Sequence, residues 1–178
     1  MATSSAELWD VIAHEAAAES PLWRNALRPS DEREREPVFS PLGEGRYALG
    51  IETIYEGYLL HYGRPRLFSP SSPEDALLLG DYLYAHGLVR IASPDQVSPV
   101  ADLAELISLC AQARARGADG DGWAWAATVS LLGRGKLDPA RERLRDSGDA
   151  APLASLAREA AGEAPVERAL MAHRARLS

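Results

Sequence analysis

The chain has 178 residues, a formal net charge of −7 and 46% hydrophobic residues. This length suits one domain with a proper core, and the negative charge, without a Lys/Arg cluster, argues against a nucleic-acid partner. The single cysteine, Cys110, excludes an internal disulfide and indicates a reducing cytoplasm. No apolar run approaches the ~20 residues of a membrane span, and we expect neither a transmembrane segment nor a signal peptide.

Almost every segment has the spacing of apolar residues that is typical of helices, so we predict an all-α bundle. Residues 1–178 are expected to form a single helical domain. Ser4 or Ser5 can cap a first helix that ends near Glu19. Residues 29–45 are rich in proline, glycine and charge, and they predict a loop or connector.

Two helices with clear end signals follow. The second spans about Arg46–Tyr62, and Gly63 is placed as its C-terminal cap. The third begins after Ser72, with Asp75 in the capping-box position, and ends near Ala92.

The later part of the chain predicts further helices, with Ser98 as the cap of the fourth. These helices are Ser98–Gly117, Trp123–Leu132, a short one opening at Asp138, and Pro165–Leu177. The segment Trp123–Leu132 is apolar on nearly all sides and should be central. Residues 134–178 have the weakest helical pattern.

Carboxylates at helical spacing raise the question of a metal site. Glu52 and Glu56 lie one turn apart and could ligate a metal, as paired carboxylates do in helix bundles. No second copy of this pair exists, so a solvated or hydrogen-bonded pair is favoured. Asp119 and Asp121 lack the further ligands of a calcium loop. We therefore predict no metal site and no cofactor.

The segment from Glu52 to Ala92 resembles part of a prenyl diphosphate synthase. Glu52–His61 is similar to the helix that precedes the first aspartate-rich motif of that family. Gly63-Arg-Pro65 is similar to its Gly-Lys-Pro, and Ala76–Ala85 to its Gly-Asp helix. A single residue, Tyr62, stands where the family carries its metal-binding aspartates.

This resemblance implies a truncated isoprenoid-synthase fold without catalytic residues. Prenyl transfer needs Mg²⁺ held on carboxylates to neutralise the departing pyrophosphate, and the aspartate-rich motifs are missing. The resemblance implies a catalytically silent subunit of a heteromeric prenyl diphosphate synthase, which supports or regulates a catalytic partner. The expected partner is that catalytic subunit, or a second copy of this chain.

The resemblance also implies roles for residues around the missing motif. Arg64 matches a position that binds diphosphate in the family, but a solvent-facing loop is favoured for Arg64 and Arg66. Gly57 and Tyr58 match positions at the floor of an apolar channel, which would hold a prenyl or lipid ligand. Close approach of another helix is the alternative for Gly57.

The Gly-Asp helix carries the remaining implied roles. Gly80 and Asp81 would be structural, with Asp81 tying the helix to its neighbours. Tyr82, Tyr84 and His86 would lie at a partner interface, because the family's dimer interface is built largely from this helix and the next. Packing of these aromatic residues in the core is the alternative.

Two other classes of function stay open. One is a magnesium-independent, isoprenoid-related enzyme that uses His61, Glu56 or Arg64. The other is a self-associating helical protein of unrelated role.

Overall fold

The computed structural model describes residues 5–93 and 95–177, and in these ranges the chain forms helices and loops without a strand. The predicted all-α class is therefore confirmed. The α-helices are α1 (Ser5–Glu19), α2 (Pro21–Ala26), α3 (Ala48–Tyr62), α4 (Pro73–Ile91), α5 (Ser98–Ala115), α6 (Asp121–Ser130), α7 (Asp138–Ser147), α8 (Ala151–Ala161) and α9 (Glu163–Leu177).

The N-terminal helices form a pair that the sequence only half predicted. α1 begins at Ser5, and Ser4 lies outside the described residues. The unpredicted helix α2 follows α1 directly. Its N-cap, Ser20, accepts a hydrogen bond from the N–H of Leu22 at 3.1 Å, and Pro21 occupies the first turn. The same Ser-Pro step therefore ends one helix and begins the next.

The predicted ends of α3 and α4 are largely confirmed. Gly63 caps α3 and donates its N–H to the carbonyl oxygen of Leu59 at 2.9 Å. Ser72 caps α4 and accepts a hydrogen bond from the N–H of Asp75 at 3.1 Å. The predicted cap of α5 is wrong, because Ser98 is its first helical residue and no side chain caps this end.

The connector before α3 is more ordered and more buried than its composition suggests. It contains short 3-10 turns, η1 (Ser30–Glu32), η2 (Ser40–Leu42) and η3 (Gly45–Tyr47). Between η1 and η2, Val38 and Phe39 are buried in the main core. The Phe39 ring stacks on Trp125 of α6 at a centroid distance of 5.5 Å. Two apolar residues thus anchor a segment that is otherwise charged.

The C-terminal helices surround α6. This helix is buried along almost its whole length, as its apolar sequence predicted. It packs against α5, α8 and α9. The helix α8 was not predicted, and no side chain caps its N-terminus. Leu153 and Ala157 of α8 are fully buried, so tertiary packing rather than a capping signal stabilises it.

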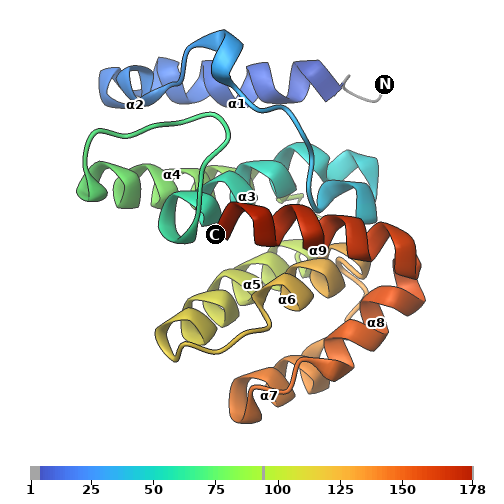
Figure 1. Cartoon of the computed structure of the whole chain (residues 1–178). Helices are drawn as coiled ribbons and strands as arrows, with labels where there is room; N and C mark the ends of the chain where they lie inside the picture. Colours follow the sequence, from blue (N-terminus) through green and yellow to red (C-terminus); the bar gives the residue numbers. More distant parts are fainter. Residues whose placement is uncertain (1–4, 94, 178) are drawn as a thin grey trace.

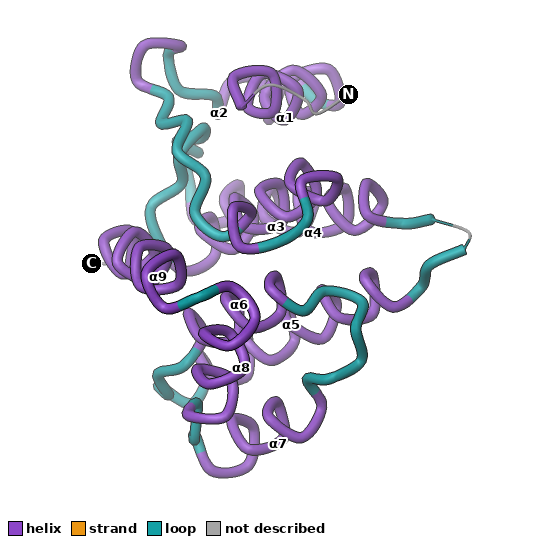
Figure 2. The backbone as a smooth tube through the Cα atoms, turned by 90° about the vertical axis from the view of Figure 1, so that its right-hand side faces the viewer, coloured by secondary structure: helices purple, strands orange, loops and turns teal. Residues whose placement is uncertain are grey.

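The helices form three layers (Figure 1). α1 and α2 lie on one side, α3 and α4 lie in the middle with α9 beside them, and α5 to α8 form the other side. The view turned by 90° shows the same order (Figure 2). Two apolar clusters follow from this arrangement, a small one that includes residues of α1, α2 and α4, and a larger one that joins α3 to α5, α6, α8 and α9.

Glycines bring α3 and α4 into close antiparallel contact. A Cβ on Gly57 would lie 2.9 Å from the carbonyl oxygen of Gly80, and a Cβ on Gly50 would lie 3.1 Å from that of Gly87. The two contacts are two helical turns apart on both helices. Any side chain at these positions would push the helices apart, so the glycines set the spacing of the middle layer.

Within the described residues, no helix is both long enough and apolar enough to span a membrane.

Candidate functional site

A closed charged cluster joins α3 to the loop that follows it. Arg66 donates from Nε to Glu56 Oε2 at 2.9 Å and from Nη1 to Glu52 Oε2 at 2.6 Å. All three side chains are fully buried. Burial opposes the charged form of Arg66, but the two carboxylates outweigh it and raise the pKa of the guanidinium. The expectation that Arg66 faces solvent is therefore wrong, because the loop folds back onto α3.

The remaining carboxylate oxygens of this cluster bind backbone N–H groups. Glu56 Oε1 accepts from Leu67 at 2.7 Å, and Glu52 Oε1 accepts from Ser40 at 3.0 Å. The ring of Trp9 lies over the guanidinium, 4.5 Å from its carbon. The cluster thus links α1, the connector, α3 and the following loop, and both carboxylates are fully engaged. Its role is structural.

A second charged cluster lies where α3 meets the ends of α5 and α9 and the start of α6. Arg114 Nε donates to Asp121 Oδ2 at 2.7 Å, and its Nη2 donates to the hydroxyl of Tyr58 at 2.9 Å. The Tyr58 hydroxyl also donates to Asp121 Oδ2. Asp121 is the first residue of α6, where the helix dipole favours a negative charge.

His173 completes this second cluster from α9, but one of its nitrogens is left without a partner. Nδ1 lies 2.9 Å from the hydroxyl of Tyr55. Nε2 lies 3.6 Å from Asp121 Oδ1, too far for a hydrogen bond, and no other described group pairs with it. The side chain is only 2% exposed. If Tyr55 donates to Nδ1, Nε2 carries a proton and is a buried donor without a hydrogen bond.

The charges around Asp121 determine its protonation. Burial alone would raise the pKa of Asp121, but His173, Tyr58 and Arg114 together hold it well below its usual range. Burial and the neighbouring Asp121 raise the pKa of Tyr58. At neutral pH the cluster therefore contains a charged carboxylate and a protonated phenol.

A pocket of about 550 Å³ opens beside this cluster. Its polar lining includes Arg114, Asp119, Asp121, His173 and Arg174. Its apolar lining includes Trp123, Leu170 and Leu177. Polar groups that converge beside an apolar wall are the usual pattern of a small-molecule site.

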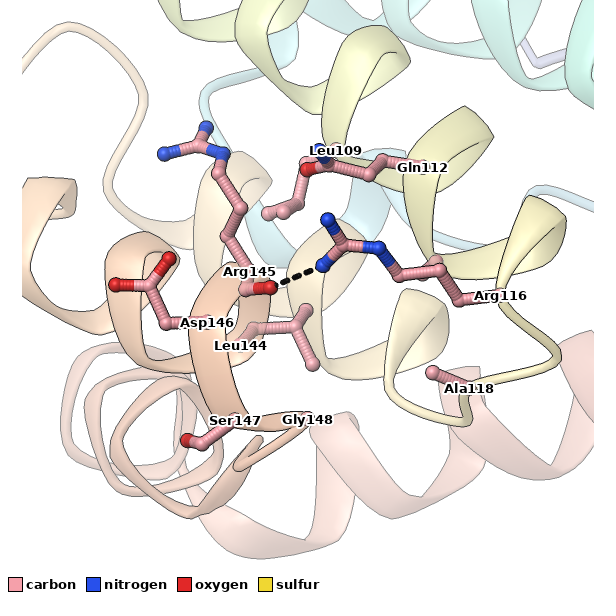
Figure 3. Close-up of a pocket in the computed structure, with 10 residues that line it drawn as sticks. Leu109, Gln112, Arg116, Ala118, Leu144, Arg145, Asp146, Ser147 and Gly148 are labelled. Carbon is pink, nitrogen blue, oxygen red and sulfur yellow. Dashed lines mark hydrogen bonds between the residues drawn. The ribbon is translucent and has the colours of Figure 1, made fainter.

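A neighbouring pocket is smaller and already crossed by a side chain. It has a volume of about 260 Å³ and lies between α5 and the end of α7. Figure 3 shows that Arg116 reaches across it and donates to the main-chain carbonyl of Arg145, while the guanidinium of Arg145 points away. Arg145 itself pairs with Glu105 of α5. The charged side chains of this pocket thus hold α5 and α7 together.

The apolar channel expected beside Gly57 is contradicted by the packing of α3 against α4. A Cβ on Gly57 would lie 2.9 Å from the Gly80 carbonyl oxygen and 3.0 Å from Cδ1 of Tyr84. The alternative, close helix approach, is correct. Tyr58 is buried, and its ring stacks on Tyr55 with an interplanar angle of 8°. Only its hydroxyl reaches toward the pocket, through Asp121.

Arg64 is exposed and lies at the C-terminus of α9. Its backbone N–H donates to the carbonyl oxygen of Arg176 at 2.9 Å, and its guanidinium approaches the carbonyl of Ala175. A cation is favourable at this end of a helix. Glu56 is fully buried and bonded to Arg66. His61, Glu56 and Arg64 therefore do not form an active site.

Gly80 and Asp81 lie where α4 meets the end of α3. A Cβ on Gly80 would lie 2.6 Å from Nε2 of His61. The side chain of Asp81 is 71% exposed, and its Oδ1 lies 3.2 Å from the same nitrogen. Both residues therefore contact His61, Gly80 through close packing and Asp81 through its carboxylate.

The three residues expected at a partner interface make contacts within the chain. The ring of Tyr82 lies 5.8 Å from that of Trp23 in α2, and its hydroxyl is 3.3 Å from Nδ1 of His86. Tyr84 stacks on His61 at 5.0 Å. These rings are only half-buried, and they flank rather than form the exposed face of α4.

That exposed face is apolar. Leu77, Leu78 and Val89 are 51%, 56% and 69% exposed, and Ala85 between them is also exposed. Their positions fall on one stripe of α4 by helical periodicity. We call Leu77, Leu78, Ala85 and Val89 the α4 face. Two exposed acidic residues, Glu74 and Asp81, lie on the same side of the helix, with Asp81 between Leu78 and Ala85.

In the part of the chain that the structure describes, no three His, Cys, Asp or Glu side chains are grouped closely enough to hold a metal ion. Arg114 and His173, which complete the second cluster, had no distinguishing signal in the sequence. No protein-family model, curated protein or solved structure matches this chain. Two features therefore define the candidate site by geometry alone, the pocket at Asp121 and His173 and the α4 face.

Proposed function

We propose that the protein is a catalytically silent subunit that docks on a catalytic prenyl diphosphate synthase through the α4 face. The observation that carries this proposal is the exposure of three large aliphatic side chains, Leu77, Leu78 and Val89, on one stripe of a single helix. Exposed apolar side chains that gather on one side of a helix favour an interaction site, whereas scattered single residues do not.

Charge favours a different protein over a second copy. The acidic residues Glu74 and Asp81 lie among the apolar residues of the α4 face, and the whole chain carries a net charge of −7. Antiparallel pairing of two α4 faces would bring the Asp81 side chains of both copies toward the same centre. A partner surface that combines apolar side chains with Lys or Arg would instead complement both the apolar and the acidic residues of this face.

The fate of the carboxylates supports a silent role. Glu52 and Glu56, the acidic pair on α3, are both bound by the buried Arg66. Tyr62 occupies the position of the first aspartate-rich motif. The choice of a prenyl synthase as partner rests on the resemblance of Glu52–Ala92, which spans α3 and α4, to that family.

A first test is activity. The purified protein, incubated with isopentenyl and farnesyl diphosphates and Mg²⁺, should form no longer product. Appreciable elongation by the protein alone would overturn the silent role.

A second test is docking. The chain should co-purify with the full-length prenyl diphosphate synthase of the same organism when the two are co-expressed. Val89→Glu should abolish this association, because it places a charge in a desolvated patch. Met171→Glu is the matched control, because Met171 is 64% exposed on α9, and it should leave association intact. Equal behaviour of the two variants, or a homodimer that only Val89→Glu dissociates, would refute docking on a synthase.

A further inference from the structure

One end of the pocket beside Asp121 and His173 is lined by polar side chains that have no part in the proposed docking. Arg114 donates hydrogen bonds from Nε and Nη2 to Asp121 and Tyr58. Its Nη1 has no hydrogen-bond partner among the described residues. Nε2 of the buried His173 makes no hydrogen bond, and its nearest acceptor is Asp121 Oδ1 at 3.6 Å. Both groups are donors, and neither makes a hydrogen bond to the Asp121 carboxylate that lies beside them.

A second guanidinium stands at the outer part of the pocket. Arg174 lines it, is 67% exposed and has only a distant ion pair, 3.9 Å from Glu167. Such a side chain can turn toward a ligand without breaking a contact of the fold. Leu170, Leu177 and Trp123 supply an apolar wall next to these donors.

The geometry points to a binding site for a small organic carboxylate with an apolar tail. The carboxylate would accept hydrogen bonds from Arg114 and Arg174, and the tail would lie on Leu170, Leu177 and Trp123. Guanidinium groups pair well with planar carboxylates.

The charge balance of the pocket favours a single negative charge on the ligand. The two guanidinium groups are matched by two carboxylates, Asp119 and Asp121. A monoanion adds one negative charge to a balanced site, whereas a phosphate monoester would add close to two. Repulsion from Asp119 and Asp121 therefore selects a carboxylate over a phosphate.

Isothermal titration calorimetry with octanoate tests this site in the full chain. Octanoate should bind saturably with one site per chain, and acetate, octanol and octyl phosphate should bind more weakly. Acetate lacks the tail, octanol lacks the charge and octyl phosphate carries the larger charge. Absence of saturable octanoate binding, or tighter binding of octyl phosphate, would overturn the assignment.

Substitutions at exposed positions locate the binding without risk to the fold. Arg174→Gln should weaken octanoate binding by about fivefold, because it removes a charged donor. Asp119→Asn should strengthen binding, because it removes a like charge from the pocket. Arg168→Gln is the matched control, because Arg168 is an exposed arginine of the same helix outside the pocket lining.

The three variants should change the octanoate affinity in three different ways: Arg174→Gln lowers it, Asp119→Asn raises it and Arg168→Gln leaves it unchanged. Loss of affinity in Arg168→Gln equal to that in Arg174→Gln would show general attraction to α9 and refute the site. An unchanged affinity in Arg174→Gln would do the same. The inference is independent of the α4 face, so Val89→Glu should leave octanoate binding unchanged whether or not docking is observed.

Discussion

The two charged clusters on α3 use similar residue types in opposite ways. In the cluster of Arg66, Glu52 and Glu56, the side chains are fully buried and each carboxylate oxygen accepts at least one hydrogen bond. In the cluster of Asp121 and His173, one nitrogen has no partner and a pocket opens beside it. The first cluster is complete within the chain, and the second is not.

This difference separates a structural role from a binding role. A buried ion pair with all its hydrogen bonds made has no capacity left for a ligand, and breaking it is costly. An incomplete cluster beside a pocket can gain an interaction when a ligand arrives. Burial alone would not distinguish them, because His173 is nearly as buried as Arg66.

The largest expected effect breaks the closed cluster. Arg66→Met leaves two buried carboxylates without their shared partner, so the free energy of unfolding should fall by about 3–5 kcal/mol. Urea denaturation measures this change. Arg64→Met is the control, because Arg64 is exposed, and it should change stability by less than about 0.5 kcal/mol. Similar losses in both variants would contradict the structural role of Arg66.

The next effect concerns the helix contact that holds both clusters in place. Gly57 lies between Glu56 and Tyr58 and faces the backbone of α4. Gly57→Ala should lower the free energy of unfolding by about 1–3 kcal/mol through overpacking, although Ala favours helix by about 1 kcal/mol. Gly45→Ala, where a Cβ meets nothing within 4 Å, is the control in the same denaturation series. Stabilisation by Gly57→Ala would disprove the close contact.

A smaller effect tests the charge of the open cluster. The pKa of Asp121 is lowered below its ordinary value of 3.8, so its charged form stabilises the fold above about pH 4, and this contribution is lost as the pH falls below that value. Asp121→Asn should reduce the free energy of unfolding at pH 7 by about 1–2 kcal/mol.

The pH dependence gives this prediction its control. The difference between the native chain and Asp121→Asn should shrink as the pH falls below 4, measured by denaturation at several pH values. Asp119→Asn changes an exposed neighbour outside the hydrogen bonds of this cluster and should show no such convergence. A constant difference between the native chain and Asp121→Asn across this range would mean that the carboxylate charge is not what stabilises the fold.

The smallest effect probes the orientation of His173. Tyr55→Phe removes the hydroxyl that lies 2.9 Å from Nδ1 and should cost about 1 kcal/mol of unfolding free energy. The hydroxyl of Tyr62 makes no hydrogen bond within the described residues, so Tyr62→Phe should be neutral when the two variants are compared by thermal unfolding. If both variants behave alike, Tyr55 does not hold the imidazole.

Local signals in the sequence were sufficient for most helices of the middle layer. Ser72 with Asp75, and Gly63 after α3, act on backbone groups within a few residues, so their effects could be predicted without the fold. The same reasoning failed for α8, which has no capping side chain and depends on packing against α6. It also failed for Phe39, whose burial depends on Trp125 of α6, far along the chain.

By itself the sequence determined the helical class, the ends of α3 and α4, and the apolar character of α6, because periodicity and capping are short-range properties. Tertiary structure alone decided the fate of the charges. Glu52 and Glu56 were visible as a pair, but only the fold brings Arg66 between them. The meeting of Asp121 with His173 likewise depends on the return of α9 to α3 and α6. Coulomb interactions and hydrogen bonds act between neighbours in space, and no spacing along the chain specifies those neighbours.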